Sequence, residues 1–291
     1  MFRGLMVVND FLRTSKFDEI YHTLLAAAQA NGMELDVSTN AELSPVVSSS
    51  FDPKAYDFVL FWDKDVQLAL QLENLGMRVF NSAQSILNCD DKGLTYILLS
   101  KAGVPVPKTI IAPKTFTNIG YPNVDFVDDV VRELGLPVVL KESFGSFGQQ
   151  VYLLDTVEAL KEKVRDLAGT PLLFQELIAE SYGHDVRVNV VGGRVAASMH
   201  RMSTDGDFRS NLTRGGTMER WTATKEQAEI AIRATEVLGL DFSGVDVLFG
   251  KDGPIVCEVN SNAHFKTTQA CTGVNMADEI MRYIAGKLAN V

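Results

Sequence analysis

Gly244-Val245-Asp246-Val247-Leu248-Phe249 and Gly253-Pro254-Ile255-Val256-Cys257-Glu258-Val259-Asn260 are alternating apolar stretches separated by Lys251-Asp252-Gly253. The alternation predicts two strands, and the polar segment between them has turn chemistry, so the pair is predicted to form a β-hairpin. Glu258 and Asn260 are two residues apart and project from one face of their strand. Asp246 can lie opposite them if the register follows the tight turn. Two carboxylates and an amide oxygen on one face are suitable ligands for Mg²⁺. The phosphates of a substrate would supply the other ligands of such an ion. A solvated strand face is the alternative.

The composition limits the classes of function. The chain has 291 residues, 46% of them hydrophobic, which is enough for about two domains or three small ones. The net charge of −10 argues against general binding to nucleic acid or to anionic membranes, but not against a basic cleft for phosphates. Three cysteines without C-x-x-C spacing predict a reducing compartment. The first apolar run is too short for a signal peptide or a membrane span, so a soluble, cytoplasmic protein is expected.

Strands that alternate with helices predict a parallel α/β domain over residues 1–88. The expected strands are apolar runs at 4–9, 33–37, 57–62 and 77–80, and helical spacing is found at 17–30 and 65–75. No G-x-G-x-x-G follows the first strand, so the usual dinucleotide-binding fold has no support.

Two α+β subdomains are predicted for the rest of the chain, at 89–178 and 179–291. The first combines strands at 138–141 and 172–178 with helices on one side of them. The second combines a hairpin at 185–202, a helix at 224–238, the hairpin quoted above and a closing helix at 275–288.

Three further features point to a nucleotide. Lys141 precedes the loop Ser143-Phe144-Gly145-Ser146-Phe147-Gly148, which allows backbone N–H groups to approach phosphate oxygens; an ordinary hairpin turn is the alternative. Gln175-Glu176-Leu177-Ile178 has the pattern of a strand edge that holds an adenine ring, or of a core strand. The loop from Phe208 to Gly216 carries arginines that are suited to recognise phosphate or carboxylate groups. The alternative is a solvent-exposed loop without a ligand.

In this order, these features resemble the ATP-grasp superfamily, and within it the RimK-like amino-acid ligases of the RimK and LysX group. The resemblance extends from about Asp90 to the C-terminus, and the strings F-R-S-N-L-x-R-G-G and G-V-D…E-V-N are very specific in combination. It implies an ATP-grasp fold, in which two α+β subdomains hold ATP between them after an N-terminal parallel α/β domain. The matching motifs are Asp91-Lys92, Lys141 with the glycine loop, Gln175–Ile178, Asp185–Val188, Phe208–Gly216, Gly244–Asp246 and Glu258–Ser261.

The resemblance also implies roles for individual residues. Lys141, Arg209 and Asn211 would be catalytic, and the cofactors would be ATP and Mg²⁺, with Mn²⁺ as a replacement. The implied ATP-binding residues are Lys92, Lys141, Ser143, Gly145, Ser146, Gly148, Glu176, Leu177, Asp185, Arg209 and Asn211, and the implied metal ligands are Asp246, Glu258 and Asn260.

The segment Ser261-Asn262-Ala263-His264-Phe265-Lys266 bears on the amino-acid substrate. It departs from the proline-containing segment of the family's ribosomal-protein glutamate ligases, and its Phe-Lys ending is more similar to ligases that add α-aminoadipate to a carrier protein. Lys266 would meet an acidic side chain, or would be a surface lysine. The four histidines are scattered along the sequence and are expected to be surface or core residues, with His264 as the exception. The candidate substrate residues are Arg187, Arg201, Arg214, Asn262, His264 and Lys266.

The implied reaction converts a carboxylate and ATP into an acyl phosphate, which an amine attacks to give an amide, ADP and phosphate. This chemistry needs positioning and charge neutralisation rather than a protein nucleophile, and the sequence has no G-x-S-x-G elbow. We expect a carboxylate–amine ligase that adds glutamate or another acidic amino acid to a protein, peptide or small-molecule carboxylate, and that forms a dimer or tetramer. A small-molecule kinase of the same fold and a non-catalytic nucleotide-binding regulatory protein are the alternatives.

Overall fold

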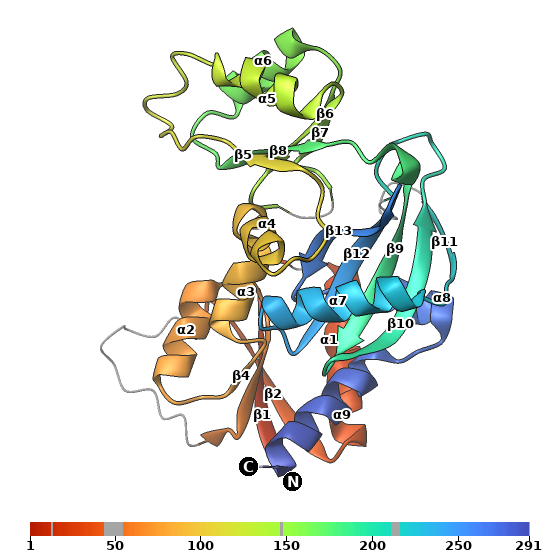
Figure 1. Ribbon diagram of the computed structural model, residues 1–291. Helices are drawn as coiled ribbons and strands as arrows, with labels where there is room; N and C mark the ends of the chain where they lie inside the picture. Colours follow the sequence, from red (N-terminus) through yellow and green to blue (C-terminus); the bar gives the residue numbers. More distant parts are fainter. Residues whose placement is uncertain (13, 44–54, 146–147, 211–215, 291) are drawn as a thin grey trace.

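Three β-sheets with covering helices make up the chain in a computed structural model (Figure 1). The structure describes residues 1–12, 14–43, 55–145, 148–210 and 216–290. One sheet is parallel and the other two are antiparallel, as the sequence predicted for an N-terminal α/β domain followed by two α+β subdomains.

The N-terminal sheet has the strand order β2-β1-β3-β4 and is parallel throughout. Both faces of β3 are covered, since all five of its residues are buried, which explains the continuous apolar run in its sequence. The strands are β1 (Phe2–Val8), β2 (Met33–Thr39), β3 (Phe58–Trp62) and β4 (Val79–Phe80), and the helices are α1 (Ser15–Ala30) and α2 (Val66–Asn74).

Two short helices, α3 (Ala83–Asp90) and α4 (Lys92–Lys101), connect this sheet to the rest of the chain. The Asp91 carboxylate caps α4 by accepting a hydrogen bond from the Leu94 N–H at 3.2 Å. Leu99 of α4 is fully buried in the core of the C-terminal sheet, although the sequence assigned this helix to the central subdomain. The exact domain boundaries therefore remain a prediction.

The central sheet has the order β5-β8-β6-β7, and all of its pairs are antiparallel. Helices α5 and α6 cover one face of it, at the top of Figure 1, and bury Val127, Leu160 and Phe174. The elements are β5 (Thr109–Ile111), α5 (Phe126–Leu134), β6 (Val138–Glu142), β7 (Val151–Leu154), α6 (Val157–Asp166) and β8 (Leu172–Glu176).

The C-terminal sheet has the order β11-β10-β9-β12-β13. Helix α7 lies across one face of it (Figure 1). Strand β11 and helix α8 were not expected from the sequence. The elements are a 3-10 turn (Ala179–Ser181), β9 (His184–Val191), β10 (Arg194–Met202), β11 (Thr217–Arg220), α7 (Lys225–Val237), β12 (Phe242–Gly250), β13 (Gly253–Asn260), α8 (Lys266–Thr272) and α9 (Met276–Ala289).

Alternation along β9 and β12 creates the two faces of this sheet. Val186, Val188, Val245 and Val247 pack into the core that includes residues of α7. The intervening residues therefore project from the opposite face, because successive side chains of a strand point to opposite sides. This second face carries Asp185, Arg187, Asn189, Gly244 and Asp246.

Asn81 joins the N-terminal sheet to the C-terminal sheet. Its side chain is fully buried, and its Nδ2 donates to the backbone oxygens of Phe242 and Ser261, both at 3.0 Å. Its Oδ1 accepts from the backbone N–H of Asp241 at 2.7 Å. A hydrophobic core also spans the two parts, because α1 packs against α9 and Trp62 stacks on Phe242. These contacts fix the relative position of the elements that form the site.

Candidate active site

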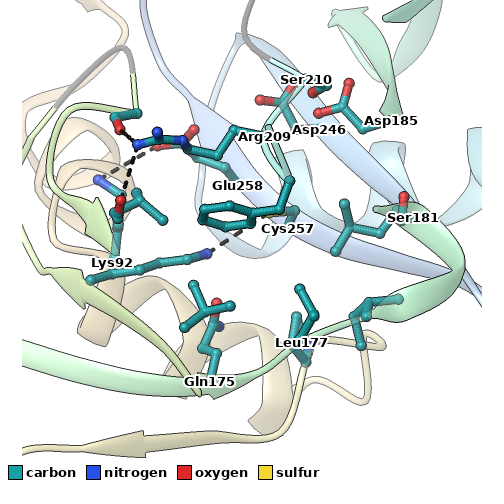
Figure 2. Close-up of a pocket in the computed structure, with 18 of the residues that line it drawn as sticks. Lys92, Gln175, Leu177, Ser181, Asp185, Arg209, Ser210, Asp246, Cys257 and Glu258 are labelled. Atoms are coloured by element: carbon teal, nitrogen blue, oxygen red, sulfur yellow. Dashed lines mark hydrogen bonds and ion pairs between the residues drawn. The ribbon is translucent and has the colours of Figure 1, made fainter. Parts of the chain in front are cut away.

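A cavity of about 920 Å³ lies between the central and C-terminal sheets (Figure 2). Leu177 and Gln175 lie along one side of it, and Asp185 and Asp246 lie on the other. Of the sequence-predicted ATP residues, the lining includes Lys92, Lys141, Gly145, Gly148, Glu176, Leu177, Asp185 and Arg209. Ser143 is buried next to them, and Asn211 and Ser146 lie outside the described residues.

The hairpin β12–β13 brings the predicted metal ligands onto one face. Asp246 is paired with Glu258, and Gly244 is paired with Asn260, so the three polar side chains project from the same side of the sheet. The register shifts after Asp246, which makes Cys257 the extra residue of a β-bulge. Both residues of such a bulge turn toward one side. Cys257 therefore lines the cavity beside Glu258, a placement that a regular strand would not predict.

Asp246 is neutralised by two arginines of neighbouring strands. Arg187 Nη2 donates to Asp246 Oδ2 at 2.9 Å, and Arg201 Nη2 lies 3.0 Å from Asp246 Oδ1. Arg201 also donates from Nε to Asp185 Oδ1 at 2.7 Å. Burial alone would raise the pKa of Asp246, but Arg187 and Arg201 outweigh it and lower the pKa. The result is a buried network of two carboxylates and two guanidinium groups.

This network changes the expected roles of its members. Asp185 was predicted to bind ATP and Asp246 to bind a metal, yet both carboxylates are occupied by arginine in this structure. Arg187 and Arg201, predicted as substrate residues, are likewise engaged. Removing one member leaves uncompensated buried charge, at a cost of about 3–5 kcal/mol.

Two lysines extend into the cavity from the central part of the chain. Lys141 is buried, with Nζ 3.3 Å from the Tyr96 hydroxyl and 3.9 Å from Cys257 Sγ. Burial disfavours its charge, but Cys257, Tyr96 and Glu258 raise its pKa above the ordinary value, so the ammonium is charged at neutral pH. Lys92 Nζ donates to the Gly145 backbone oxygen at 3.1 Å and lies 3.5 Å from Glu258 Oε1. Both cations are placed to meet a polyphosphate.

Arg209 connects the glycine loop to the C-terminal subdomain. Its Nη1 donates to the backbone oxygens of Gly148 at 2.7 Å and Val151 at 3.0 Å (Figure 2). Asp207 accepts from Nε and Nη2 of the same side chain, at 2.9 and 2.7 Å. The Asp207 carboxylate raises the pKa of Arg209 and burial lowers it. The effect of Asp207 is larger, so the pKa is raised. The arginine predicted to face phosphates thus also fixes one end of the loop.

A second cavity, of about 1440 Å³, opens between the N-terminal and C-terminal sheets. Four residues line both cavities: Gly148, Arg201, Asp246 and Glu258. Asn260, Asn262, His264 and Arg187, which were predicted as metal or substrate residues, also line the second cavity, and their roles remain predictions. Burial, with help from Lys16, lowers the pKa of His264 to about 4, so its ring is neutral at pH 7.

Lys266 is not among the described residues that line this cavity. Its Nζ is 3.1 Å from Glu19 Oε2 on α1, and both side chains are partly exposed. The acidic group that Lys266 contacts is thus a side chain of the protein. The proposed contact of Lys266 with a substrate receives no support. Arg214 lies outside the described residues.

The residues at the junction of the cavities are suited to a hard cation. Asn260 Nδ2 is buried and has no hydrogen-bond partner within the described ranges. Since the two ends of an amide are interchangeable in such an assignment, rotation brings its oxygen to the same place. Glu258 and Asn260 therefore offer oxygen ligands, and Asp246 does so only in exchange with its arginines. The described residues contain no group of three or more His, Cys, Asp or Glu side chains arranged to hold a metal.

Several residues near the cavities were not identified from the sequence. Tyr96 donates to the Cys257 backbone oxygen, and Asp63 with Asn9 lines the second cavity. Two histidines that are far apart in the sequence lie close together in the structure, with His184 Nδ1 and His200 Nε2 3.1 Å apart. Only the pairing of β9 with β10 brings these two histidines together. A possible signal for Asp63 was its position directly after an apolar strand.

The model of the RimK-like ATP-grasp domain matches residues 89–284. The chain belongs to the RimK-like ATP-grasp family. The match covers the central and C-terminal sheets and both lysines of the first cavity. The match confirms the family and the fold that were expected from the motifs. ATP is the nucleotide that gives this family its name.

Named relatives of this family member are ligases. The chain is 33% identical to a probable alpha-L-glutamate ligase of Vibrio atlanticus over 292 residues, which cover 93% of each chain. It is 36% identical to human N-acetylaspartylglutamate synthase A over 230 residues, covering 78% of this chain and 57% of that protein. The chain thus spans little more than half of the human relative. The expected enzyme class, an ATP-grasp ligase, is confirmed.

A solved structure extends the likeness to the whole chain. A RimK domain ATP-grasp protein from Sphaerobacter thermophilus superimposes with a TM-score of 0.74 at 25% identity, covering 96% of this chain and 98% of that one. The N-terminal sheet of the RimK-like chain is therefore part of the shared architecture. In the described part of the chain, no helix is both long and apolar enough to cross a membrane.

Proposed function

We propose that this protein joins L-glutamate, or another acidic amino acid, to a carboxylate-bearing acceptor through an acyl phosphate. One observation carries the proposal: the two cavities meet at Gly148, Arg201, Asp246 and Glu258. A nucleotide with its base near Leu177 extends its phosphates toward this junction. An acid in the second cavity reaches the same place from the other side, so its oxygen can attack the terminal phosphorus.

Charge at the junction supports phosphoryl transfer. Lys92 and Lys141 face the phosphate path, and the Arg187–Arg201–Asp246 network holds two further cations beside it. Glu258, Asn260 and Asp246 would hold Mg²⁺, which would supply charge neutralisation to the phosphates. Fixed cations of this kind stabilise the developing charge without reorganisation.

The second cavity supports an acidic substrate. Lys16, Lys64, Arg187 and Arg201 are among its lining residues. Lys64, Arg187 and Arg201 also pair with carboxylates of the protein, so a substrate carboxylate would share these three cations with them. One of the relatives is named as a probable alpha-L-glutamate ligase and another as an N-acetylaspartylglutamate synthase. Glutamate is thus the first amino acid to test, and the acceptor is a carboxylic acid.

A screen of ADP release tests this proposal. The twenty amino acids are combined with three acceptors: N-acetyl-L-aspartate, citrate and a peptide that ends in glutamate. We expect ADP release that requires both partners, and a product whose mass equals acceptor plus amino acid minus water. ADP release with a phosphorylated acceptor and no need for an amine would instead show a kinase. No ADP release in any combination would favour a regulatory nucleotide-binding protein.

A further inference from the structure

The carboxyl edge of the N-terminal sheet carries a polar pair with no role in the site described above. Asn9 follows β1 and Asp63 follows β3, and these two strands are adjacent and parallel. The chain leaves β1 toward β2 on one side, and it leaves β3 toward β4 on the other. The two loops therefore diverge and leave a crevice at the strand ends, which is where open parallel sheets bind ligands.

Asp63 is held in a fixed orientation inside this crevice. Asn9 Nδ2 lies 3.1 and 3.3 Å from the two oxygens of its carboxylate, and the Lys64 backbone N–H donates to Oδ1 at 2.7 Å. Asp63 is only 7% exposed, yet it lines the second cavity together with Asp246 and Glu258. Burial raises its pKa despite the hydrogen bonds from Asn9 and Lys64.

The other carboxylates of the second cavity are already paired. Asp246 is bonded to two arginines, and Glu258 lies 3.5 Å from Lys92. In the described part of the chain, Asp63 is the cavity carboxylate that has no ion pair with a lysine or arginine. A cationic group that enters the cavity thus meets Asp63 as its available anionic partner.

We propose that Asp63 binds the α-ammonium group of the incoming amino acid and accepts its proton before the nitrogen attacks the acyl phosphate. The inference rests on the proposed function, and it assigns the amine to the N-terminal domain and the acid to the junction of the cavities. Asn9 is a positioning residue that orients the carboxylate.

The step balances in atoms and charge. Asp63 takes one proton from the ammonium, and the neutral amine forms a C–N bond with the acyl carbon. The bond from this carbon to the phosphate oxygen breaks, and the departing phosphate takes the second proton of the nitrogen. The products are the amide and hydrogen phosphate, and protonated Asp63 returns its proton to solvent.

Charged and titratable groups around Asp63 set its pH response. They come from its own loop, from α1 and from the facing sheet, and they are Lys64, Asp65, Lys16, Tyr21, Arg187, Arg201, Asp246, Glu258 and His264. Lys64 is paired with Asp90, and its charge also lowers the pKa of Asp63, but burial outweighs this effect.

The test separates the two half-reactions in Asp63→Asn. With N-acetyl-L-aspartate, or the acid of the screen that supports turnover, hydroxylamine traps the acyl phosphate as a hydroxamate and needs no base at pH 7.5. We expect hydroxamate formation within about threefold of wild type, and glutamate ligation lower by about 100-fold or more, the range for loss of a general base. Between pH 6.5 and 8.5 the residual ligation should rise about tenfold per pH unit, because more of the glutamate is then the free amine.

Asp65→Asn is the matched control. Asp65 caps α2 by accepting from the Leu68 N–H, lies two residues from Asp63, and is not a described lining residue of either cavity. Asparagine caps equally well, and the Asp65 charge affects the pKa of Asp63 less than burial, Asn9 and the Lys64 N–H do, so both rates should stay within about twofold. Equal losses of hydroxamate and amide in Asp63→Asn would overturn the proposal, as would unchanged ligation. Absence of any glutamyl product from the wild type would refute the proposed function itself.

Discussion

Asp246 and Glu258 face each other across β12 and β13, but their environments differ sharply. Asp246 is buried and bonded to Arg187 and Arg201, whereas the Glu258 side chain is 35% exposed and lies 3.5 Å from Lys92. Two carboxylates that the sequence treats as equivalent ligands therefore differ in how much stability depends on them.

Glu258→Gln separates catalysis from stability. The glutamine keeps the size of the side chain and an oxygen near Lys92, whose Nζ also donates to the Gly145 backbone oxygen at 3.1 Å. We expect ADP release to fall by at least about 100-fold, while the unfolding midpoint in guanidinium stays unchanged. Near-normal ADP release would contradict the metal assignment of Glu258.

Asp246→Asn should behave differently in the same two assays. Arg187 would keep its buried charge without a carboxylate partner, and Arg201 would keep only Asp185, so the free energy of unfolding should fall by about 3–5 kcal/mol. An unfolding midpoint equal to that of wild type would show that Asp185 suffices to hold both arginines.

Arg209→Ala should release one end of the glycine loop. The variant loses the bonds to the Gly148 and Val151 backbone oxygens, and with them the link across the first cavity. We expect faster cleavage by protease near residues 143–150 without nucleotide, and a KM for ATP that is raised about tenfold. Mass spectrometry of the fragments, with and without ATP, measures this.

Arg132→Ala is a control for general loss of positive charge, because Arg132 makes an exposed ion pair with Asp129 on α5. Its cleavage pattern should match that of wild type. Equal cleavage of Arg209→Ala and wild type near the loop would show that the Arg209 bonds do not hold it.

Gly244→Ala tests the space behind the substrate segment. A Cβ at this position would lie 2.5 Å from the Cβ of Ala263 and 3.2 Å from Arg187 Cδ, so the chain near Ala263 must move. We expect a loss of about 1–3 kcal/mol in stability and a larger rise in the KM for the amino acid than for ATP. The double variant Gly244→Ala with Ala263→Gly removes the clash and should restore both quantities. If the double variant does not restore them, the losses come from the contact with Arg187 and not from the contact with Ala263.

His264 should make the protein less stable in acid. Its pKa is about 4 in the folded protein, against an ordinary value of 6.5. Above pH 6.5 the ring is neutral in both states, and its contribution is fully present. As the pH falls toward 4, the unfolded chain binds a proton that the folded chain excludes, so stability is lost. After allowance for solvent screening of a partly exposed group, the loss is about 1–2 kcal/mol.

Guanidinium unfolding at pH 7.5 and pH 5.0 measures this loss. His264→Gln should show a smaller decrease between the two conditions than wild type by about 1 kcal/mol. His22→Gln, at an exposed position on α1, is the control and should follow wild type. Parallel curves for His264→Gln and wild type would contradict the assignment.

The sequence predicted the elements of the site well where local pattern decides structure. The hairpin, the glycine loop with Lys141 and the strand that ends at Glu176 follow from alternation and turn residues, and the motifs identified the family. The same local signals did not reveal β11 or α8. Strand β11 is short and fully exposed, so it has no alternation of buried and exposed residues to detect.

By itself, the sequence determined which polar residues share a strand face, because a two-residue period follows from backbone geometry alone. Only the tertiary structure decided which partners those residues meet. Strand order places Arg187 beside Asp246, the bulge turns Cys257 toward Lys141, and the divergence of two loops opens the crevice at Asp63. Ion pairing and burial depend on contacts between segments that are far apart in the chain. No local sequence pattern specifies how these segments pack against one another.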